Sequence, residues 1–500
     1  MIILDHIKRF TLLKSILMKV HLILFVLFFS HSLVAQTELT KALLNDTAID
    51  DDLQELCDQI GGRVTGSESN IASVEWAYSK FNEMGVSVEK MEFEMPALWL
   101  EAYTECSIKG AHGDFKPQMV AKYMSPAGTY LDELIFVGFG RAADYDTLSI
   151  GDVKGKIILV ESDLCLDIDG LFSEYGHSAE VETEAIKRGV KAIVFMASRP
   201  TKLLYRFITA NGVDNTLPQV VMAREDAQRT MRRIMDGESL KIELEINTTE
   251  GGPFKSYNVI AEIPGSEFPD EVIIIGAHLD SWALGTGAND NGCNVSMMID
   301  IARQMHRLQI KPKRTIRFAL WNGEEQGYFG SWAYNEREKK NLNKHRMAMS
   351  VDIGSGAITG FFTNGRGELI PVLDQCLAPV NNIRDFNHLN IPIVGTDNFD
   401  FMLQGIPNLV AIHKPATYGV NYHASSDTYD KVDIQTLKSN AAIVAQLTLA
   451  YANLAPSTIP PRSTRVEMEQ LFLEHNLEFT MRMFNVWEPW ASGNRGLSKE

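Results

Sequence analysis

The stretch EVIIIGAHLDSWALGTGANDNG, residues 271–292, constrains the fold of this chain more than any other part of the sequence. It contains a continuous apolar run, which is typical of a strand buried on both faces of a parallel sheet. The run ends in His278 and Asp280, and the chain then reaches Asp290 inside a glycine-rich turn. Apolar strands seldom end in so many ionisable groups, so the stretch predicts a site at the end of a buried strand.

Beyond about residue 257, strand-like apolar runs alternate with segments of helical periodicity. The strand-like runs are EVIIIGA, TIRFALW, MAMSVDIG and NLVAIHK, and the helical segments include NVSMMIDIARQMHRL and residues 434–454. This alternation predicts an α/β fold, with a mixed, mainly parallel sheet sandwiched by helices. In such sheets, active residues gather at the carboxyl ends of the strands.

The length of 500 residues predicts more than one domain, because a single core stops growing well below that size. Between about residues 110 and 250 the texture changes to short β-rich runs broken by Gly, Asp and Pro, as in a small separate module. The expected division is a signal peptide at 1–35, the first part of a catalytic domain at 36–110, an insert at 111–250, the catalytic domain at 251–456 and a C-terminal extension at 457–500.

The N-terminus predicts export. Basic residues, Lys8 to Lys19, precede the apolar run LILFVLFFSHSLVA, which has the length of a signal peptide and is short for a membrane span. The alternative is a retained N-terminal anchor. We expect a secreted or periplasmic protein with no stable membrane span after processing.

The overall charge argues against a role on nucleic acid. The formal net charge is −17, whereas a nucleic-acid-binding protein needs a basic face to contact phosphates. Five scattered cysteines without the spacing of a metal site or a disulfide framework indicate a fold that depends on its core.

Metal-binding side chains follow each predicted strand of the α/β region. They are His278, Asp280, Asp290, Glu324, Glu325, Asp352 and His423. Carboxylates that lie close together in a partly buried cleft need a cation to offset their repulsion. Imidazole and carboxylate ligands without thiolate point to zinc. Two histidines and three carboxylates suit two metals about 3.5–4 Å apart better than one, and Asp290 is the candidate bridging ligand.

Three further acids have expected supporting roles. A metal-binding imidazole generally donates its other N–H to a carboxylate, and Asp280 and Asp427 are close enough in sequence to serve His278 and His423 in this way. Two neighbouring side chains at the end of a strand point in different directions. Glu325 is therefore expected to bind metal while Glu324 acts as general base.

The motifs that carry these residues resemble those of a known family. AHLDSWALGTGANDNG, ALWNGEEQGYFGSWAY, SVDIG and YHASSDT are similar to the motif set of the co-catalytic zinc aminopeptidase family, in its plasma glutamate carboxypeptidase-like subgroup. GDVKGKIILV and AIKRGVKAIVF resemble a protease-associated module inserted in the catalytic domain. The resemblance covers most of residues 50–455.

The resemblance implies two zinc ions per chain and the same assignment of residues. The implied ligands are His278, Asp290, Glu325, Asp352 and His423, with Asp290 bridging, Glu324 as base and Asp280 behind the first histidine. Tyr422 matches a tyrosine that stabilises the tetrahedral oxyanion in related enzymes. Asp397 lies in a segment that often shapes the substrate pocket.

We therefore expect an exported binuclear zinc exopeptidase that acts on peptides. A metal-bridged hydroxide would hydrolyse the peptide bond that follows the N-terminal residue of a peptide, or the single peptide bond of a dipeptide. Three alternatives stay open: a carboxypeptidase for acidic C-termini, a single-zinc glutaminyl cyclase on the same scaffold, and a catalytically dead binding protein. The sequence also leaves open whether the chain forms a homodimer.

Overall fold

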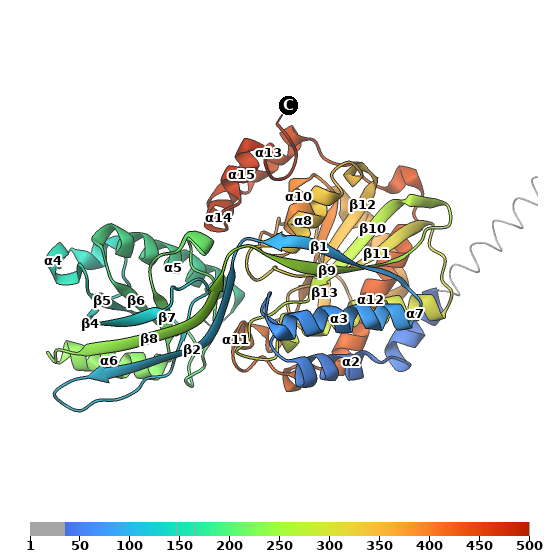
Figure 1. Ribbon diagram of the computed structural model, residues 1–500. Helices are drawn as coiled ribbons and strands as arrows, with labels where there is room; N and C mark the ends of the chain where they lie inside the picture. The colour runs from blue at the N-terminus through green and yellow to red at the C-terminus, as the bar shows by residue number, and fades with distance from the viewer. Residues whose placement is uncertain (1–35, 147, 166, 500) are drawn as a thin grey trace, which may run out of the picture.

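The computed structural model describes residues 36–146, 148–165 and 167–499, and the expected signal peptide at residues 1–35 lies outside them. The described chain forms two lobes, each built on a seven-stranded mixed sheet, with a group of short C-terminal helices beside the larger lobe (Figure 1). Helices flank both sheets, and the predicted α/β class is confirmed.

The sheet of the larger lobe has the strand order β1-β9-β11-β10-β12-β14-β13. The four central strands β11, β10, β12 and β14 are parallel, and the strands outside them run antiparallel to their neighbours. The strands are β1 (Ser87–Met95), β9 (Phe254–Ile263), β10 (Phe268–His278), β11 (Arg314–Trp321), β12 (His345–Ser350), β13 (Ile358–Phe362) and β14 (Asn408–His413).

Both faces of this sheet are covered, which explains the unbroken apolar run in β10. Ile273 and Ile275 face one hydrophobic cluster, and Val272 and Ile274 face another. The first face carries α2 (Ile49–Glu55), α3 (Glu68–Glu83), α7 (Cys293–Arg307), α9 (Ile370–Leu377) and α12 (Ile434–Ala452). The second carries α8 (Phe329–Arg337) and α10 (Asn398–Leu403).

The sheet of the smaller lobe has the order β2-β8-β4-β5-β6-β7-β3, with β4 to β7 parallel. Its strands are β2 (Leu98–Lys109), β3 (Met119–Ala121), β4 (Gly128–Phe136), β5 (Ile157–Val160), β6 (Ala192–Met196), β7 (Gln219–Met222) and β8 (Lys241–Gly251). Its helices are α4 (Ile150–Val153), α5 (Ile168–Arg188) and α6 (Arg224–Met235).

The antiparallel pair β1/β9 of the larger sheet continues as the pair β2/β8 of the smaller one (Figure 1). The chain thus enters and leaves the smaller lobe through adjacent strands. Because β2 belongs wholly to the smaller sheet, we propose that the insert covers residues 98–251 and begins before the residue 111 expected from the sequence.

The C-terminal extension forms three helices, α13 (Arg465–Glu474), α14 (Leu477–Met483) and α15 (Trp487–Ser492). Their apolar side chains, with Trp490 at the centre, pack on Phe399, Met402 and Leu403 of α10. In Figure 1 the end of α14 points towards the smaller lobe.

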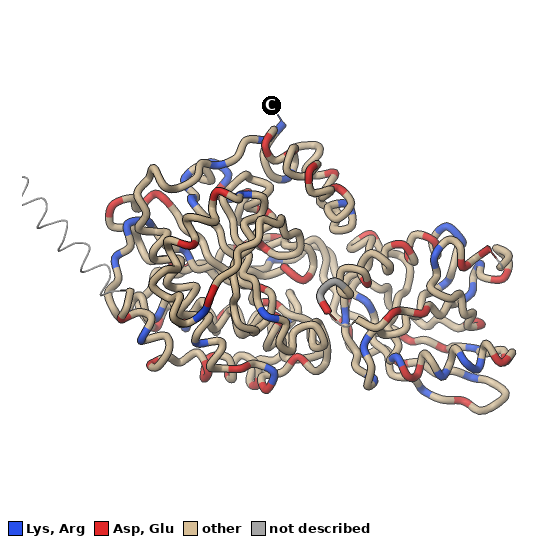
Figure 2. Tube along the Cα trace, turned by 180° about the vertical axis from the view of Figure 1, so that it is seen from behind, with Lys and Arg blue, Asp and Glu red and all other residues tan. Residues whose placement is uncertain are grey.

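In the view of Figure 2, acidic and basic residues are interspersed over both lobes. None of the helices in the described residues combines the length and hydropathy that crossing a membrane requires. All five cysteines are buried free thiols, so the described chain contains no disulfide.

Candidate metal centre and substrate pocket

The predicted site residues lie at the carboxyl ends of the four central parallel strands. His278 is the last residue of β10, Glu324 and Glu325 follow β11, and Asp352 follows β12. His423 follows β14 through the short helix α11 (Tyr418–Asn421). Parallel strands end at the same edge of a sheet, so these four segments, which are far apart in the sequence, meet at one edge.

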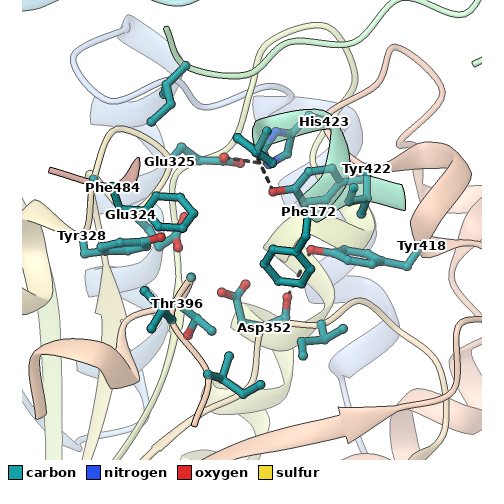
Figure 3. A pocket seen from close by; sticks show the side chains of 18 residues that line it. Phe172, Glu324, Glu325, Tyr328, Asp352, Thr396, Tyr418, Tyr422, His423 and Phe484 are labelled. Carbon is teal, nitrogen blue, oxygen red and sulfur yellow. Dashed lines mark hydrogen bonds and ion pairs between the residues drawn. The ribbon is translucent and has the colours of Figure 1, made fainter. Parts of the chain in front are cut away.

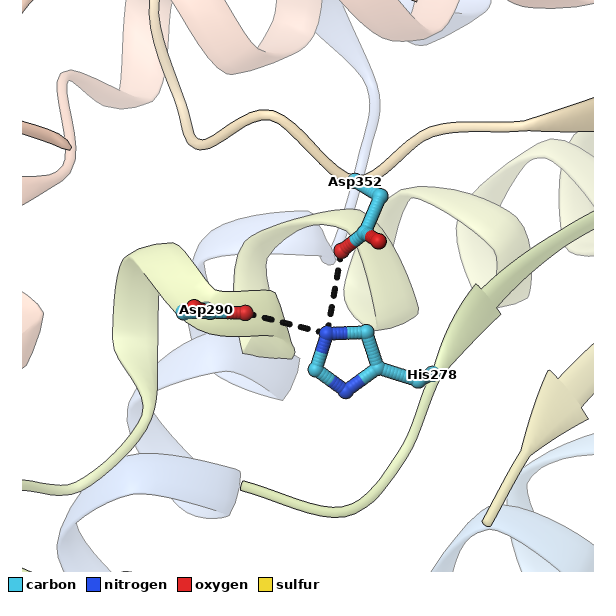
Figure 4. Close-up of side chains that lie close together, drawn as sticks. All are labelled: His278, Asp290 and Asp352. Carbon is cyan, nitrogen blue, oxygen red and sulfur yellow. Dashed lines mark hydrogen bonds and ion pairs between the residues drawn. The ribbon is translucent and has the colours of Figure 1, made fainter. Parts of the chain in front are cut away.

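One group of donor atoms consists of His278, Asp290 and Asp352 (Figure 4). Nε2 of His278 lies 3.0 Å from Oδ1 of Asp290 and 3.0 Å from Oδ1 of Asp352. All three side chains are buried. One imidazole and two carboxylates within this distance form a donor set that suits zinc.

A second group consists of Asp290, Glu325 and His423, so Asp290 belongs to both. Nε2 of His423 lies 2.9 Å from Oε2 of Glu325 and 3.3 Å from Oδ2 of Asp290. The two oxygens of Asp290 thus face different histidines. This is the arrangement that a carboxylate needs to contact two cations at once.

The other nitrogen of each histidine bonds to a backbone carbonyl. Nδ1 of His278 donates to the carbonyl oxygen of Asp280 over 2.9 Å, and Nδ1 of His423 donates to that of Arg206 over 2.9 Å. A carbonyl can only accept, so these bonds leave Nε2 as the atom available to bind a metal. Each Nε2 faces carboxylate oxygens, and a cation between them would satisfy both.

The expected partners of the two histidines are therefore corrected. The carboxylate of Asp280 lies 3.7 Å from Nδ1 of His278 and accepts hydrogen bonds from Thr65 and from the backbone N–H groups of Glu324 and Glu325. Its side chain supports the turn after β11, and its backbone carbonyl orients the histidine.

Asp427 does not bond to His423. It accepts hydrogen bonds from both nitrogens of Asn289, at 2.8 and 3.0 Å, and from the backbone N–H of Asp290, at 3.1 Å. Nδ1 of His423 instead faces Arg206 of the insert. Asp427 thus holds the loop that presents Asp290, a role that its position after His423 could not indicate.

Burial strongly perturbs the titration of these groups. Burial raises the pKa of Glu324 well above its ordinary value, and the charge of nearby Asp352 raises it further. Burial raises the pKa of Glu325 to about 7, although His423 opposes the shift. Burial disfavours the charged form of His423, but Glu325 and Asp290 outweigh it and raise the pKa to about 9.

One carboxylate oxygen of Glu325 is buried without a hydrogen-bond partner among the described residues. Acids that burial pushes towards neutrality, one with an unpaired oxygen, fit a centre that is completed by cations.

A pocket with a cavity volume of about 110 Å³ opens beside the two donor groups (Figure 3). Glu324 lines this pocket and belongs to neither group, whereas Glu325 belongs to the second. Glu325 lines the pocket as well, so the two neighbouring glutamates differ in that only Glu325 belongs to a donor group. The pocket walls include six aromatic residues: Phe172, Tyr175, Tyr328, Tyr418, Tyr422 and Phe484.

Tyrosine side chains of the pocket contact the residues of the donor groups. The ring of Tyr422 stacks on His423 with centroids 3.6 Å apart, and its hydroxyl lies 3.2 Å from that of Tyr175 in α5 of the insert. The hydroxyl of Tyr418 lies 3.4 Å from Oδ2 of Asp290. The sequence analysis did not find Tyr418, because a tyrosine five residues before a ligand has no distinguishing pattern.

The pocket role expected for Asp397 is wrong. Asp397 is buried at the start of α10 and lines a small separate cavity with Ser350 and Trp321, while its neighbour Thr396 lines the substrate pocket. Burial raises the pKa of Asp397 well above its ordinary value. Both oxygens of its carboxylate are buried without a hydrogen-bond partner among the described residues.

Two residues of the N-terminal segment, which sequence reasoning missed, hold the loops of the site. The guanidinium of Arg63 is fully buried and donates to the carbonyl oxygens of Leu279, Thr286 and Gly287, at 2.6–3.0 Å. It therefore fixes the loop between His278 and Asp290. A lone arginine in a glycine-rich segment gives no local signal of such a long-range role.

Thr65 connects the turn that carries the two glutamates to Asp280. Its hydroxyl donates to Oδ2 of Asp280 over 3.0 Å and accepts from the N–H of Gly323 over 3.0 Å. In Thr65→Val, both buried partners lose this bond at nearly unchanged side-chain volume. We expect the free energy of unfolding to fall by about 1–3 kcal/mol and kcat to fall with it. Denaturant unfolding and steady-state kinetics measure the two effects.

Thr65→Ser is the matched control, because it keeps the hydroxyl, and it should retain most of the stability and turnover. A Val variant with wild-type stability and kcat would contradict the role assigned to Thr65.

Comparison with known proteins agrees with this geometry. Residues 258–448 match peptidase family M28. Carboxypeptidase Q of Xenopus laevis is 28% identical over 313 residues, which cover 61% of this chain and 64%, less than two thirds, of that protein. Probable leucine aminopeptidase 2 of Trichophyton verrucosum is 29% identical over 422 residues, covering 78% of this chain and 80% of that protein. The crystal structure of a peptidase M28 precursor from Shewanella amazonensis SB2B superposes with a TM-score of 0.77 at 25% identity, covering 87% of this chain and 100% of that one.

These relatives confirm the resemblance to the co-catalytic zinc aminopeptidase family that the motifs indicate. The family match includes His278, Asp290, Glu324, Glu325 and His423. Residues 258–448 of this chain are therefore similar to peptidase family M28, and the chain shares its fold with the M28 peptidase precursor from Shewanella amazonensis.

Proposed function

We propose that the protein is an exported exopeptidase with two zinc ions per chain that releases N-terminal residues or splits dipeptides. The observation that carries this proposal is the shared membership of Asp290 in both donor groups, with one oxygen towards each histidine. His278 and Asp352 would hold one zinc ion, Glu325 and His423 would hold the other, and Asp290 would contact both.

Glu324 is proposed as the general base. When bound, the zinc ions would polarise the scissile carbonyl and lower the pKa of a water molecule. Glu324 lines the pocket, and burial raises its pKa well above the ordinary value, which makes its carboxylate a stronger proton acceptor than an exposed one. It would accept the proton of the attacking water and pass it to the leaving amine. The hydroxyl of Tyr422, at the same pocket, would donate a hydrogen bond to the oxyanion.

The charges of the pocket favour recognition of a free amino terminus. Among the described residues that line it there are Glu324, Glu325 and Asp352, and there is no Lys or Arg. A substrate ammonium group is attracted both by these acids and by the faces of aromatic rings. An acidic C-terminus would bring two carboxylates to a pocket whose lining, among the described residues, contains three acids and neither Lys nor Arg. This supports the aminopeptidase or dipeptidase assignment over the carboxypeptidase alternative.

The proposal is tested with one dipeptide in three forms: free, N-acetylated and C-amidated. The zinc content of the purified protein is measured on the same sample. We expect two zinc ions per chain, hydrolysis of the free and amidated forms, and loss of hydrolysis on acetylation, because the acetyl group removes the ammonium charge.

Hydrolysis that survives acetylation and prefers acidic C-terminal residues would establish a carboxypeptidase. One zinc ion together with cyclisation of N-terminal Gln peptides would establish a glutaminyl cyclase. Two zinc ions without turnover on any peptide would indicate a binding protein.

We also propose that the chain is exported after cleavage of its N-terminal segment. The N-terminal sequence of the protein recovered from its host would locate the cleavage expected near residue 35. Sedimentation of the mature chain would distinguish a monomer from the homodimer left open by the sequence.

A further inference from the structure

The C-terminal extension contributes one residue, Phe484, to the lining of the substrate pocket. Phe484 directly follows α14, and its ring centroid lies 6.1 Å from that of Tyr328 in the catalytic domain. On its other side, the ring lies 6.2 Å from Tyr175 in α5 of the insert. The ring therefore spans the gap between two parts of the chain that meet at the pocket (Figure 3).

The extension is anchored to the catalytic domain near its C-terminal end. Arg495 donates two hydrogen bonds of 2.8 Å to the carboxylate of Asp400 in α10, and both side chains are buried. The guanidinium of Arg465 stacks on Trp490 at 3.4 Å, and the N–H of Leu497 donates to the backbone of α10. A buried, bidentate charged pair of this kind is costly to break. The position of Phe484 is thus set by packing and hydrogen bonds on the catalytic domain.

Phe484 also separates the substrate pocket from a second cavity. Phe484, Tyr175 and Ile208 line both spaces, and the second cavity lies between the insert and the extension, against Ser178 and Met483. The second cavity is much smaller, about 10 Å³ against about 110 Å³. Removing the Phe484 ring would join the two and lengthen the pocket at this end.

We propose that Phe484 is a specificity-determining residue that limits the size of the N-terminal side chain of the substrate. This inference rests on the proposed exopeptidase function. In an exopeptidase, only the terminal residue of the substrate lies against the closed side of the pocket. The remainder of the peptide must extend out through the open side. Of the two aromatic residues, Phe172 is 46% exposed, whereas Phe484 is half-buried and also borders the second cavity.

The test compares dipeptides that carry Ala, Leu, Phe or Trp at the N-terminus and the same second residue. In Phe484→Ala, we expect the ratio of kcat/KM for the Trp peptide over the Ala peptide to rise at least about tenfold, as the joined cavities admit the larger ring. In Phe484→Trp the ratio should fall by a similar factor. The zinc content of both variants should equal that of the wild type, since Phe484 contacts none of the donor groups.

Phe479→Ala is the matched control, because Phe479 lies on α14 of the same extension and is 71% exposed. It should keep the wild-type ratio. An unchanged ratio in both Phe484 variants, or an equal change in Phe479→Ala, would overturn the proposal. If Phe484→Ala does not fold, Phe484→Leu and Phe484→Trp decide it by the same ratio. A wild-type protein that releases no N-terminal residue defeats the proposed function, whereas an active wild type with unchanged variant ratios defeats this inference alone.

Discussion

Glu324→Gln is expected to keep both zinc ions and to lower kcat by about 10²–10⁴-fold, the usual contribution of a general base. Gln has nearly the shape of Glu but cannot take a proton from water. Glu324 belongs to neither donor group, so its replacement should leave the metal centre intact. The measurement is zinc content by elemental analysis beside kcat for a dipeptide substrate.

The adjacent residue provides the matched control for this variant. Glu325 belongs to the second donor group, so Glu325→Gln should lower zinc content as well as turnover. Turnover close to that of the wild type in Glu324→Gln would show that another group moves the proton. Zinc loss equal to that of Glu325→Gln would show that Glu324 is a ligand.

Asp290→Ala should remove zinc from both sites and lower turnover below that of Glu324→Gln. Each oxygen of Asp290 faces a different histidine, at 3.0 and 3.3 Å, so its loss takes a donor from both groups. It also leaves four neighbouring ligands without the carboxylate that links them. Zinc content and affinity, measured by competition with a chelator, report this effect separately from activity.

The matched control replaces a buried aspartate that lies outside the donor groups. It shows how much zinc is lost when any buried carboxylate is removed. Asp300 lies in α7, bound to Arg303 and Thr47, and Asp300→Asn should retain two zinc ions. An Asp290→Ala protein that holds two zinc ions with wild-type affinity would exclude the bridging role.

The main features of the catalytic domain could be predicted from local sequence patterns. An apolar run such as that in β10 must be buried on both faces, and alternation with helices makes its sheet parallel. Parallel strands end at one edge, so His278, Glu325 and Asp352 had to be neighbours although they are far apart in the sequence. The type of each side chain then indicated the chemistry.

Roles that depend on distant segments could not be read in the same way. Asp427 follows His423 closely, yet it bonds to the loop of Asp290, because the histidine ring turns towards the insert. Asp397 belongs to a segment that reaches the pocket, yet its side chain turns inward while that of Thr396 lines the cavity. Sequence proximity does not determine which way a loop side chain points.

The sequence by itself determined the fold class, the edge of the sheet that carries the site and the residue types available there, because these follow from hydrophobic periodicity and from the identity of the side chains. Tertiary structure alone decided which donors form each group, that Arg63 and Thr65 hold the loops of the centre, and that Phe484 reaches the pocket. These contacts join segments separated by long stretches of chain, and their geometry arises only when the two lobes and the C-terminal helices pack together.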